Sequence, residues 1–300
     1  MTLKRYQRRR LDSPCPALPK YCYNPSMKPD TSNFRPKGMW ADGDAYEPYV
    51  GRWSRLVALP FLDWLGVPPG RRWLDVGCGT GALTEAILQV ADPRSVRGID
   101  AAEGYVAFAR ARITDGRAEF QVGDAHALPV EAANFDAVVS GLALNFVAQP
   151  AQAIVEMAHA VKKGCPVAAY VWDYGGRVQF MRHFWNAAAA LDPSAAALDE
   201  GRRFPLCNPE PLAELFQSVG LVDVAVRPLD IWTEFTDFDD YWLPFLGGQG
   251  PAPSYTMSIG ESDRAALRER LRVALPFTLD GSIPLMARAW AVRGFTGGRF

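Results

Sequence analysis

The chain has 300 residues, of which 49% are hydrophobic and 22% are charged, and its formal net charge at pH 7 is −1. This composition is ordinary for a soluble globular enzyme, and it gives no overall attraction to nucleic acid or anionic lipid. Five cysteines, an odd number without paired metal-ligand spacing, predict free thiols and a reducing, cytoplasmic location. The length suits one large domain with insertions.

Residues 1–40 differ in composition from the rest of the chain. They hold nine Lys/Arg against two Asp, together with six prolines, and they show no apolar periodicity. This pattern predicts a disordered basic tail, followed by a folded domain over residues 41–300. An RNA-binding arm or an address label is the alternative for the tail. The longest uncharged run, 137–155, is interrupted by polar residues and is better explained by a strand, a loop and a helix start than by a membrane span.

Apolar spacing predicts a helix over 46–65 that ends at Gly66, and from residue 71 onward strands and helices alternate. The predicted strands are 71–76, 96–100, 118–122, 135–140 and 167–172, and the predicted helices are 82–90, 103–112 and 150–163. Such alternation predicts right-handed crossovers and a parallel sheet covered on both faces. Ligands of such sheets bind at the carboxyl ends of the strands.

The segment 73–81 is an apolar strand that runs into three alternating glycines. The strand carries one acid, Asp75, which needs a partner if it is buried and which the strand's end directs toward a ligand's ammonium group. Gly77, Gly79 and Gly81 allow backbone conformations closed to other residues and let a ligand approach closely. The segment therefore predicts a cofactor site.

Two kinds of cofactor fit this turn. Gly77, Gly79 and Ala82 match the looser fingerprint of dinucleotide-binding proteins, so a nicotinamide-dependent oxidoreductase is one alternative. Asp100 and Asp124, which each close a later predicted strand, together with the Gly-x-Gly-x-Gly spacing favour a methyl-donor site instead.

The run Asp-Val-Gly-Cys-Gly-Thr-Gly resembles the first motif of the class I S-adenosylmethionine-dependent methyltransferases, and the resemblance extends over residues 46 to about 174. It implies a Rossmann-like, doubly wound α/β fold with a seven-stranded, mostly parallel sheet. Segment 284–292 would supply its antiparallel last strand and 222–228 the strand before it. Segments 174–207 and 237–283 exceed ordinary connection lengths and are expected to be helical lid insertions.

The resemblance also implies S-adenosylmethionine as the cofactor and assigns residues to it. Asp100 would bind the ribose hydroxyls, Asp124 in Gly-Asp-Ala would meet the adenine amino group, and Arg52 is a candidate for the methionine carboxylate. A surface arginine is the alternative for Arg52. The candidate cofactor-binding residues are Asp75, Gly77, Cys78, Gly79, Gly81, Asp100, Asp124, Ala125, Ser140, Tyr46 and Arg52.

Methyl transfer from a sulfonium is a direct displacement, so the enzyme has to align two reactants and exclude water. Metal-dependent members of the family place acids after the fourth strand, and segment 140–145 has none, which predicts a metal-independent enzyme. His183, Asp173 and Tyr174 are the candidate catalytic residues. We expect a small, apolar or aromatic metabolite as the acceptor, with no nucleic-acid or membrane partner. A non-catalytic protein that binds the methyl donor is a further alternative.

Overall fold

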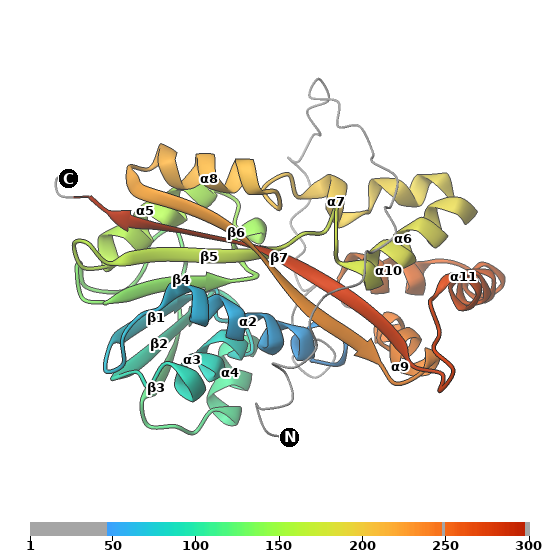
Figure 1. Cartoon of the computed structure of the whole chain (residues 1–300), viewed down its shortest axis with the longest axis horizontal. Coiled ribbons are helices and arrows are strands. Elements are labelled where there is room, and N and C mark those ends of the chain that lie inside the picture. The colour runs from blue at the N-terminus through green and yellow to red at the C-terminus, as the bar shows by residue number, and fades with distance from the viewer. Residues whose placement is uncertain (1–46, 248–249, 298–300) are drawn as a thin grey trace. The chain divides into compact units, whose positions relative to one another are not determined.

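The computed structural model describes residues 47–247 and 250–297. The predicted tail over 1–40 and the candidate residue Tyr46 lie outside the described residues. A seven-stranded sheet with the order β3-β2-β1-β4-β5-β7-β6 forms the centre of the domain (Figure 1). Its strands are β1 (Arg72–Val76), β2 (Ser95–Asp100), β3 (Ala118–Val122), β4 (Ala137–Gly141), β5 (Pro166–Trp172), β6 (Leu221–Phe235) and β7 (Ile283–Thr296).

The first five strands are parallel to one another, and β7 lies antiparallel between β5 and β6. This topology confirms the expected Rossmann-like, doubly wound class. Helices cover both faces of the sheet, with α2, α3 and α4 on one side and α5 and α8 on the other (Figure 1). Their bounds are α2 (Arg52–Leu65), α3 (Ala82–Val90), α4 (Glu103–Arg112), α5 (Pro150–Ala160) and α8 (Pro209–Ser218), and a short π-helix, η2 (Glu47–Gly51), precedes α2.

The ends of two helices show how the sequence sets these bounds. After α2 the chain enters the left-handed conformation at Gly66 (φ +60°), whose N–H donates to the carbonyl of Leu62, as the glycine there predicts. By contrast, α5 ends at Ala160 and not at residue 163, because the next residue, Val161, is extended and forms a parallel bridge with Phe135.

The last two strands are longer than the sequence pattern predicts. β6 and β7 pair along their whole length, from Leu221 opposite Thr296 to Phe235 opposite Ile283. By contrast, β5 pairs only with residues 289–295 of β7. The distal half of the β6–β7 ribbon therefore extends beyond β5 (Figure 1). Along this half, alternate residues of β6 from Leu229 to Phe235 are buried, so one of its faces is covered by other elements.

The two insertions fold into helices that pack on one another, and we call them together the insertion layer. Its elements are α6 (Gln179–Leu191), η4 (Pro193–Ala197), α7 (Glu200–Arg203), α9 (Phe238–Trp242), η5 (Leu243–Gly247), α10 (Pro251–Ser258) and α11 (Glu261–Ala274). α6 contacts β7, α10 and α11, and α9 contacts β6. The layer thus joins segments that are far apart in the sequence.

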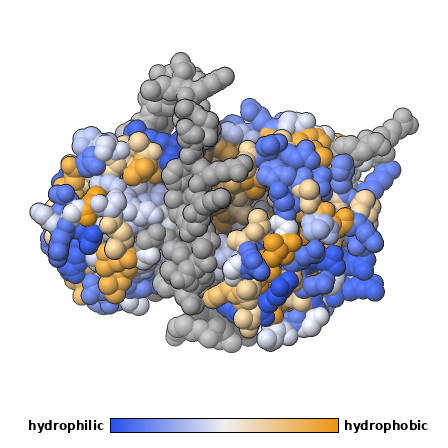
Figure 2. All heavy atoms as spheres, turned by 180° about the vertical axis from the view of Figure 1, so that it is seen from behind, coloured by the Kyte–Doolittle hydropathy of each residue, from blue (hydrophilic) through white to orange (hydrophobic). Residues whose placement is uncertain are grey.

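Within the described ranges, no helix is long and apolar enough to cross a membrane. Seen from behind, the described surface mixes hydrophilic and hydrophobic residues in small patches (Figure 2).

Candidate functional site

The glycine turn after β1 has the backbone that its sequence predicts. Gly77, Gly79 and Gly81 have φ values of +73°, +53° and +87°. A Cβ on Gly77 would fall 2.5 Å from the Cβ of Ala143, whereas one on Gly79 would meet nothing within 4 Å. Gly77 is therefore needed for packing, and Gly79 borders open space that a ligand can approach.

Asp75, the acid of β1, is fully buried. Its Oδ2 accepts a hydrogen bond of 2.8 Å from the hydroxyl of Thr84, whereas Oδ1 is buried without a hydrogen-bond partner among the described residues. Burial raises the pKa of Asp75 to about 7, and the charge of Asp100 adds to this rise. Because an unpaired buried carboxylate oxygen is costly, Asp75 fits the ammonium group of a ligand.

Asp100 ends β2 directly beside the glycine turn. Its Oδ2 accepts the backbone N–H of Gly79 and its Oδ1 accepts that of Ala102, both at 2.9 Å. Burial raises the pKa of Asp100, and these backbone hydrogen bonds oppose the rise. A carboxylate accepts about four hydrogen bonds, so Asp100 keeps capacity to accept from the ribose.

The ends of β3 and β4 complete this edge of the sheet. The N–H of Gly123 donates to the carbonyl of Asp100 at 3.0 Å, and Asp124 lies two residues beyond the end of β3. The Asp124 carboxylate is exposed; its Oδ1 accepts the N–H of His126 at 2.9 Å and lies 2.7 Å from Nδ1 of the same residue. Both contacts lower the pKa of Asp124, and the hydrogen bond from the backbone N–H of His126 contributes most.

Three further candidates lie in the same loops. Ala125 is partly buried beside Asp124, and Ser140 is buried near the end of β4. Cys78 is buried with residues of α4 and β3 (Val106, Ala109 and Phe120), and burial raises the pKa of its thiol. The structure therefore gathers the predicted donor residues from 75 to 140 at the carboxyl ends of β1 to β4.

Arg52 has a different setting. Its Nη1 forms an ion pair of 2.7 Å with Asp240 of α9, and its guanidinium lies 4.4 Å from the ring centre of Trp53 and 4.8 Å from that of Phe235. Arg52 thus joins α2 to the insertion layer. Its contact with a methionine carboxylate stays a prediction.

The three candidate catalytic residues also have distinct surroundings. The Asp173 carboxylate accepts the N–H of Arg177 at 3.1 Å and so closes its own turn after β5, and burial raises its pKa. Tyr174 is buried, with its ring centre 5.8 Å from that of Phe204. His183 lies on α6, where burial lowers its pKa and favours the neutral ring at pH 7.

The structure adds a buried acid that the sequence analysis does not single out. Glu200 is 2% exposed, and Oε2 accepts a hydrogen bond from Nε1 of Trp185 on α6. Burial raises the pKa of Glu200 to about 7. No periodicity could have pointed to Glu200, because its helix, α7, has only four residues.

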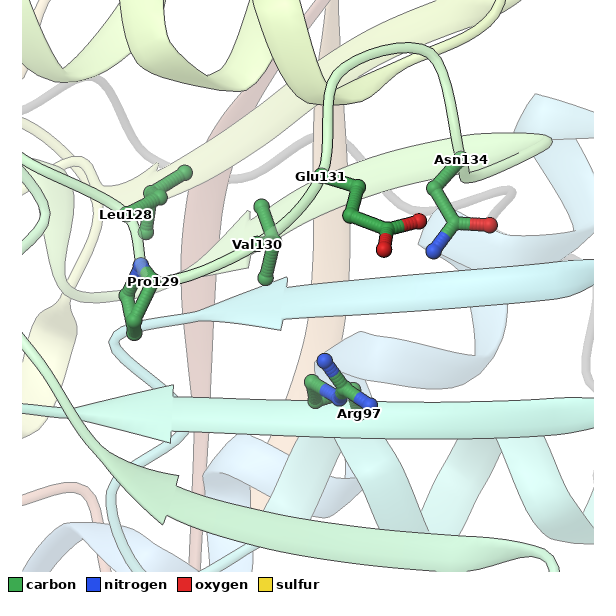
Figure 3. A pocket seen from close by; sticks show the side chains of 6 residues that line it. All are labelled: Arg97, Leu128, Pro129, Val130, Glu131 and Asn134. Carbon is green, nitrogen blue, oxygen red and sulfur yellow. The ribbon is translucent and has the colours of Figure 1, made fainter.

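One hollow of about 570 Å³ lies elsewhere, under the loop between β3 and β4 (Figure 3). It is lined by Arg97, Leu128, Pro129, Val130, Glu131 and Asn134. Arg97 lies in the middle of β2 and pairs with Glu119 of β3, so the hollow extends over the middle of the sheet. It shares no lining residue with the donor site.

Comparison with known proteins decides the family. The model of a methyltransferase domain matches residues 74–168. The demethylmenaquinone methyltransferase of Renibacterium salmoninarum is 31% identical over 191 residues, which cover 60% of this chain and 76% of that protein. The chain belongs to the class I S-adenosylmethionine-dependent methyltransferases. The alternative of a nicotinamide-dependent oxidoreductase is therefore wrong.

Two further similarities agree with this assignment. A 2-phytyl-1,4-naphtoquinone methyltransferase of Synechocystis is 36% identical over 142 residues, covering 45% of this chain and 59% of that protein. A solved structure from Bacillus halodurans superposes with a TM-score of 0.53 at 15% identity, over 80% of this chain and 99% of that one, and this likeness concerns the fold alone.

S-adenosylmethionine is the cofactor of this methyltransferase, and the described residues fit it. The unpaired Oδ1 of Asp75 suits the donor's ammonium, and the remaining capacity of Asp100 suits the ribose. Gly79, whose N–H donates to Asp100, borders open space.

Proposed function

We propose that this methyltransferase transfers the methyl group to a small, apolar, aromatic acceptor, and that the acceptor is a quinol. The observation that carries this proposal is a cluster of aromatic side chains in and beside the insertion layer. Neighbouring rings have centroids 4.5 to 6.4 Å apart. The members are Tyr49, Phe180, Phe184, Trp185, Phe235, Tyr241, Phe245 and Tyr255.

The relatives support the same class of acceptor. Two of them are named as methyltransferases of demethylmenaquinone and of a phytyl naphthoquinone. Flat aromatic ligands pack well between aromatic side chains, and each ring pair contributes about 0.5–1.5 kcal/mol beyond the area it buries.

The proposed mechanism is a direct displacement. The bound donor supplies a methyl group on a positively charged sulfur. Asp75 and Asp100 hold the donor's ammonium and ribose, Asp124 and Ala125 lie where the adenine is expected, and the aromatic cluster keeps water from the reaction. Alignment of the reactants and exclusion of water, and not activation by a metal, provide most of the rate acceleration.

We further propose that no metal takes part, because segment 140–145 at the end of β4 contains no acid. Activity is expected to survive treatment with EDTA. Restoration of a chelated enzyme specifically by Mg²⁺ would contradict this proposal.

We propose a cytoplasmic location and a small molecule as the only partner in catalysis. The free thiols of Cys78, Cys165 and Cys207 support a reducing compartment. The formal net charge of −1 supports the absence of a nucleic-acid or membrane partner.

The test is transfer of a labelled methyl group from S-adenosylmethionine to defined acceptors. We expect incorporation into 1,4-dihydroxynaphthalene but not into phosphoethanolamine or RNA, with the Asp100→Ala variant as a control for the donor site. Incorporation into one of the other acceptors alone would overturn the proposed acceptor. Donor binding with no transfer to any acceptor, including a metabolite extract, would favour the non-catalytic alternative.

A further inference from the structure

A polar group of the insertion layer is not used by the donor site. The carboxyl of Glu200 is buried and accepts a hydrogen bond from Nε1 of Trp185. Trp185 packs edge-on against Phe184, at 5.1 Å between ring centres, and Phe184 stacks on Phe245 at 4.5 Å. Burial of an acid in such surroundings costs stability, which makes Glu200 a candidate for a functional role.

Glu200 lies above the carboxyl ends of β4 and β5. The next residue, Gly201, packs on the turn after β5 so closely that a Cβ there would fall 2.6 Å from Cα of Gly175. The ring of Phe204, at the end of α7, contacts Phe146 after β4 at 5.1 Å between ring centres. Parallel strands bind their ligands at this edge, so α7 covers the region next to the donor site.

The position of Glu200 is fixed by its neighbours. Asp199 accepts the N–H of Gly201 at 2.8 Å and forms a two-pronged ion pair with Arg182 of α6, in which Nη1 and Oδ2 are 2.7 Å apart. These contacts tie α7 to α6, and the indole of Trp185 holds the Glu200 carboxyl. The acid is therefore held rigidly, as a group that binds or transfers a proton needs to be.

Tyr49 supplies a hydroxyl in the same surroundings. Its ring packs against Phe180 and Phe245, at 6.4 and 5.4 Å between centres. Its hydroxyl is buried and has no hydrogen-bond partner among the residues that the structure describes. Burial raises the pKa of Tyr49, and the nearby charge of Glu200 raises it further. Tyr49 is thus a buried, neutral donor with no acceptor among the described residues, and its ring packs on Phe245, which stacks on the Phe184 neighbour of Trp185.

We propose that Glu200 and Tyr49 form the site for the hydroxyl group of the methyl acceptor. Glu200 takes the proton of this hydroxyl, and Tyr49 donates a hydrogen bond to the oxygen as it becomes negative. This inference deepens the proposed function and rests on it.

The proposed step balances without a further reactant. The acceptor's O–H proton passes to the Glu200 carboxylate, and the electron pair left on the oxygen increases the electron density of the ring. A ring carbon, or the oxygen itself, attacks the donor's methyl carbon as the methyl–sulfur bond breaks and the sulfur leaves neutral. After attack by carbon, the hydrogen on the methylated carbon is lost as a proton to water, which restores the aromatic ring.

The charges around Glu200 set the pH at which it acts. Burial raises its pKa to about 7; Asp199 raises it as well, whereas the hydrogen bond from Trp185 and the charge of Arg182 lower it. Tyr49 and Cys207 are neutral at pH 7, because burial raises their pKa values and the charge of Glu200 raises them further. Glu200 is thus protonated below pH 7 and able to accept a proton above it, so kcat/KM should rise with pH through about 7.

The main test compares Glu200→Gln and Tyr49→Phe with the native enzyme, using 1,4-dihydroxynaphthalene without oxygen. At saturating S-adenosylmethionine, where the ionisation of Asp75 no longer limits donor binding, Glu200→Gln is expected to lower kcat/KM for the quinol about 10²- to 10⁴-fold and to abolish its rise near pH 7. Tyr49→Phe is expected to lower kcat/KM about tenfold without lowering the Tm, because it removes a hydroxyl that has no hydrogen-bond partner within the described part of the chain. Both variants should bind S-adenosylmethionine as the native enzyme does. Glu214→Gln, an exposed acid on α8, is the matched control.

The outcomes separate this inference from the proposed function. If the native enzyme methylates the quinol and both variants keep its kcat/KM and pH profile, the inference is wrong and the proposed function stands. If the native enzyme does not methylate the quinol, the proposed function is wrong. Calorimetry then tests the hydroxyl site of Glu200 and Tyr49 directly, by measuring how 1,4-dihydroxynaphthalene binds to the complex of the protein with S-adenosylhomocysteine. Weaker binding by both variants supports it; equal binding by the native enzyme and the variants, or no binding at all, overturns it.

Discussion

The candidate donor residues that the structure brings together come from the continuous segment 75–140, whereas the aromatic cluster of the insertion layer joins residues as distant as Tyr49 and Tyr255. The candidate donor site depends on backbone conformation and on the strand ends. It contains three glycines with positive φ and an acid at a strand end, Asp100, that accepts hydrogen bonds from backbone N–H groups. Side-chain packing builds the cluster. The donor site should therefore be sensitive to backbone changes, and the insertion layer to the identity of a few polar side chains.

The largest effect is expected where the backbone is most constrained. Gly77→Ala places a Cβ 2.5 Å from Ala143 at φ +73°. The left-handed conformation costs about 1–2 kcal/mol and overpacking about 1–3 kcal/mol, so the free energy of unfolding should fall by about 2–5 kcal/mol. Chemical denaturation measures this change.

Gly79→Ala is the matched control, since its φ of +53° is similar but its Cβ meets nothing within 4 Å. It should cost only about 1–2 kcal/mol of stability. It should also weaken S-adenosylmethionine binding, because the new methyl group enters space that the donor needs. Equal destabilisation by the two substitutions would contradict the packing role given to Gly77.

The next effect concerns Asp100. Hydrogen bonds from ribose hydroxyls to its carboxylate contribute about 1.5–3 kcal/mol, so Asp100→Ala should raise the Kd for S-adenosylmethionine roughly ten- to 150-fold. Calorimetric titration gives the value. An unchanged Kd in a folded variant would remove Asp100 from the donor site.

The ionised Asp75 carboxylate should lower the stability of the fold but strengthen binding of the donor. Its pKa is about 7 in the folded protein, above the ordinary value of 3.8. The stability that this difference contributes is fully present below pH 3.8 and is lost as the pH rises through about 7. Asp75→Asn removes the dependence, so above pH 7 the variant should be at least as stable as the native protein. It should bind S-adenosylmethionine about tenfold more weakly, because the carboxylate that faces the ammonium is gone.

Melting curves and Kd values at pH 5 and pH 8 test the Asp75 prediction. Native affinity for the donor should also rise with pH through about 7, as Asp75 ionises. A variant with unchanged affinity at pH 8 would show that the ammonium binds elsewhere.

The sequence predicts the donor region well because its signals are local. Apolar runs and glycines place β1 to β5 within about two residues of their bounds. The glycine spacing and the strand-end acids Asp75, Asp100 and Asp124 identify the donor edge. The structure brings these residues together as expected.

The insertion layer and the full length of β6 could not be predicted, because they depend on contacts between residues that are distant in the sequence. Glu200 takes its place from the packing of Gly201 on Gly175 and from the pair of Arg182 and Asp199, none of which leaves a periodic signal. The length of β6 follows from pairing with β7 and from cover by the insertion layer. Arg52 is placed by Asp240, a partner 188 residues away.

The smallest effects are expected at the ion pair of Arg52 and Asp240, which links α2 to the insertion layer. The side chains of Arg52 and Asp240 are 30% and 26% exposed, so the ion pair stabilises the fold by only about 0.2–1 kcal/mol, and neither Arg52→Gln nor Asp240→Asn should lower stability by more. If Arg52 also holds the methionine carboxylate, Arg52→Gln should raise the Kd for S-adenosylmethionine about two- to fivefold, whereas Asp240→Asn should not. Titration with 5′-methylthioadenosine, which lacks the amino and carboxylate groups, is the control, and Arg52→Gln should leave its binding unchanged. A loss of affinity for both ligands, or for S-adenosylmethionine in Asp240→Asn as well, would show that the pair acts by positioning α2 and not by contact with the carboxylate.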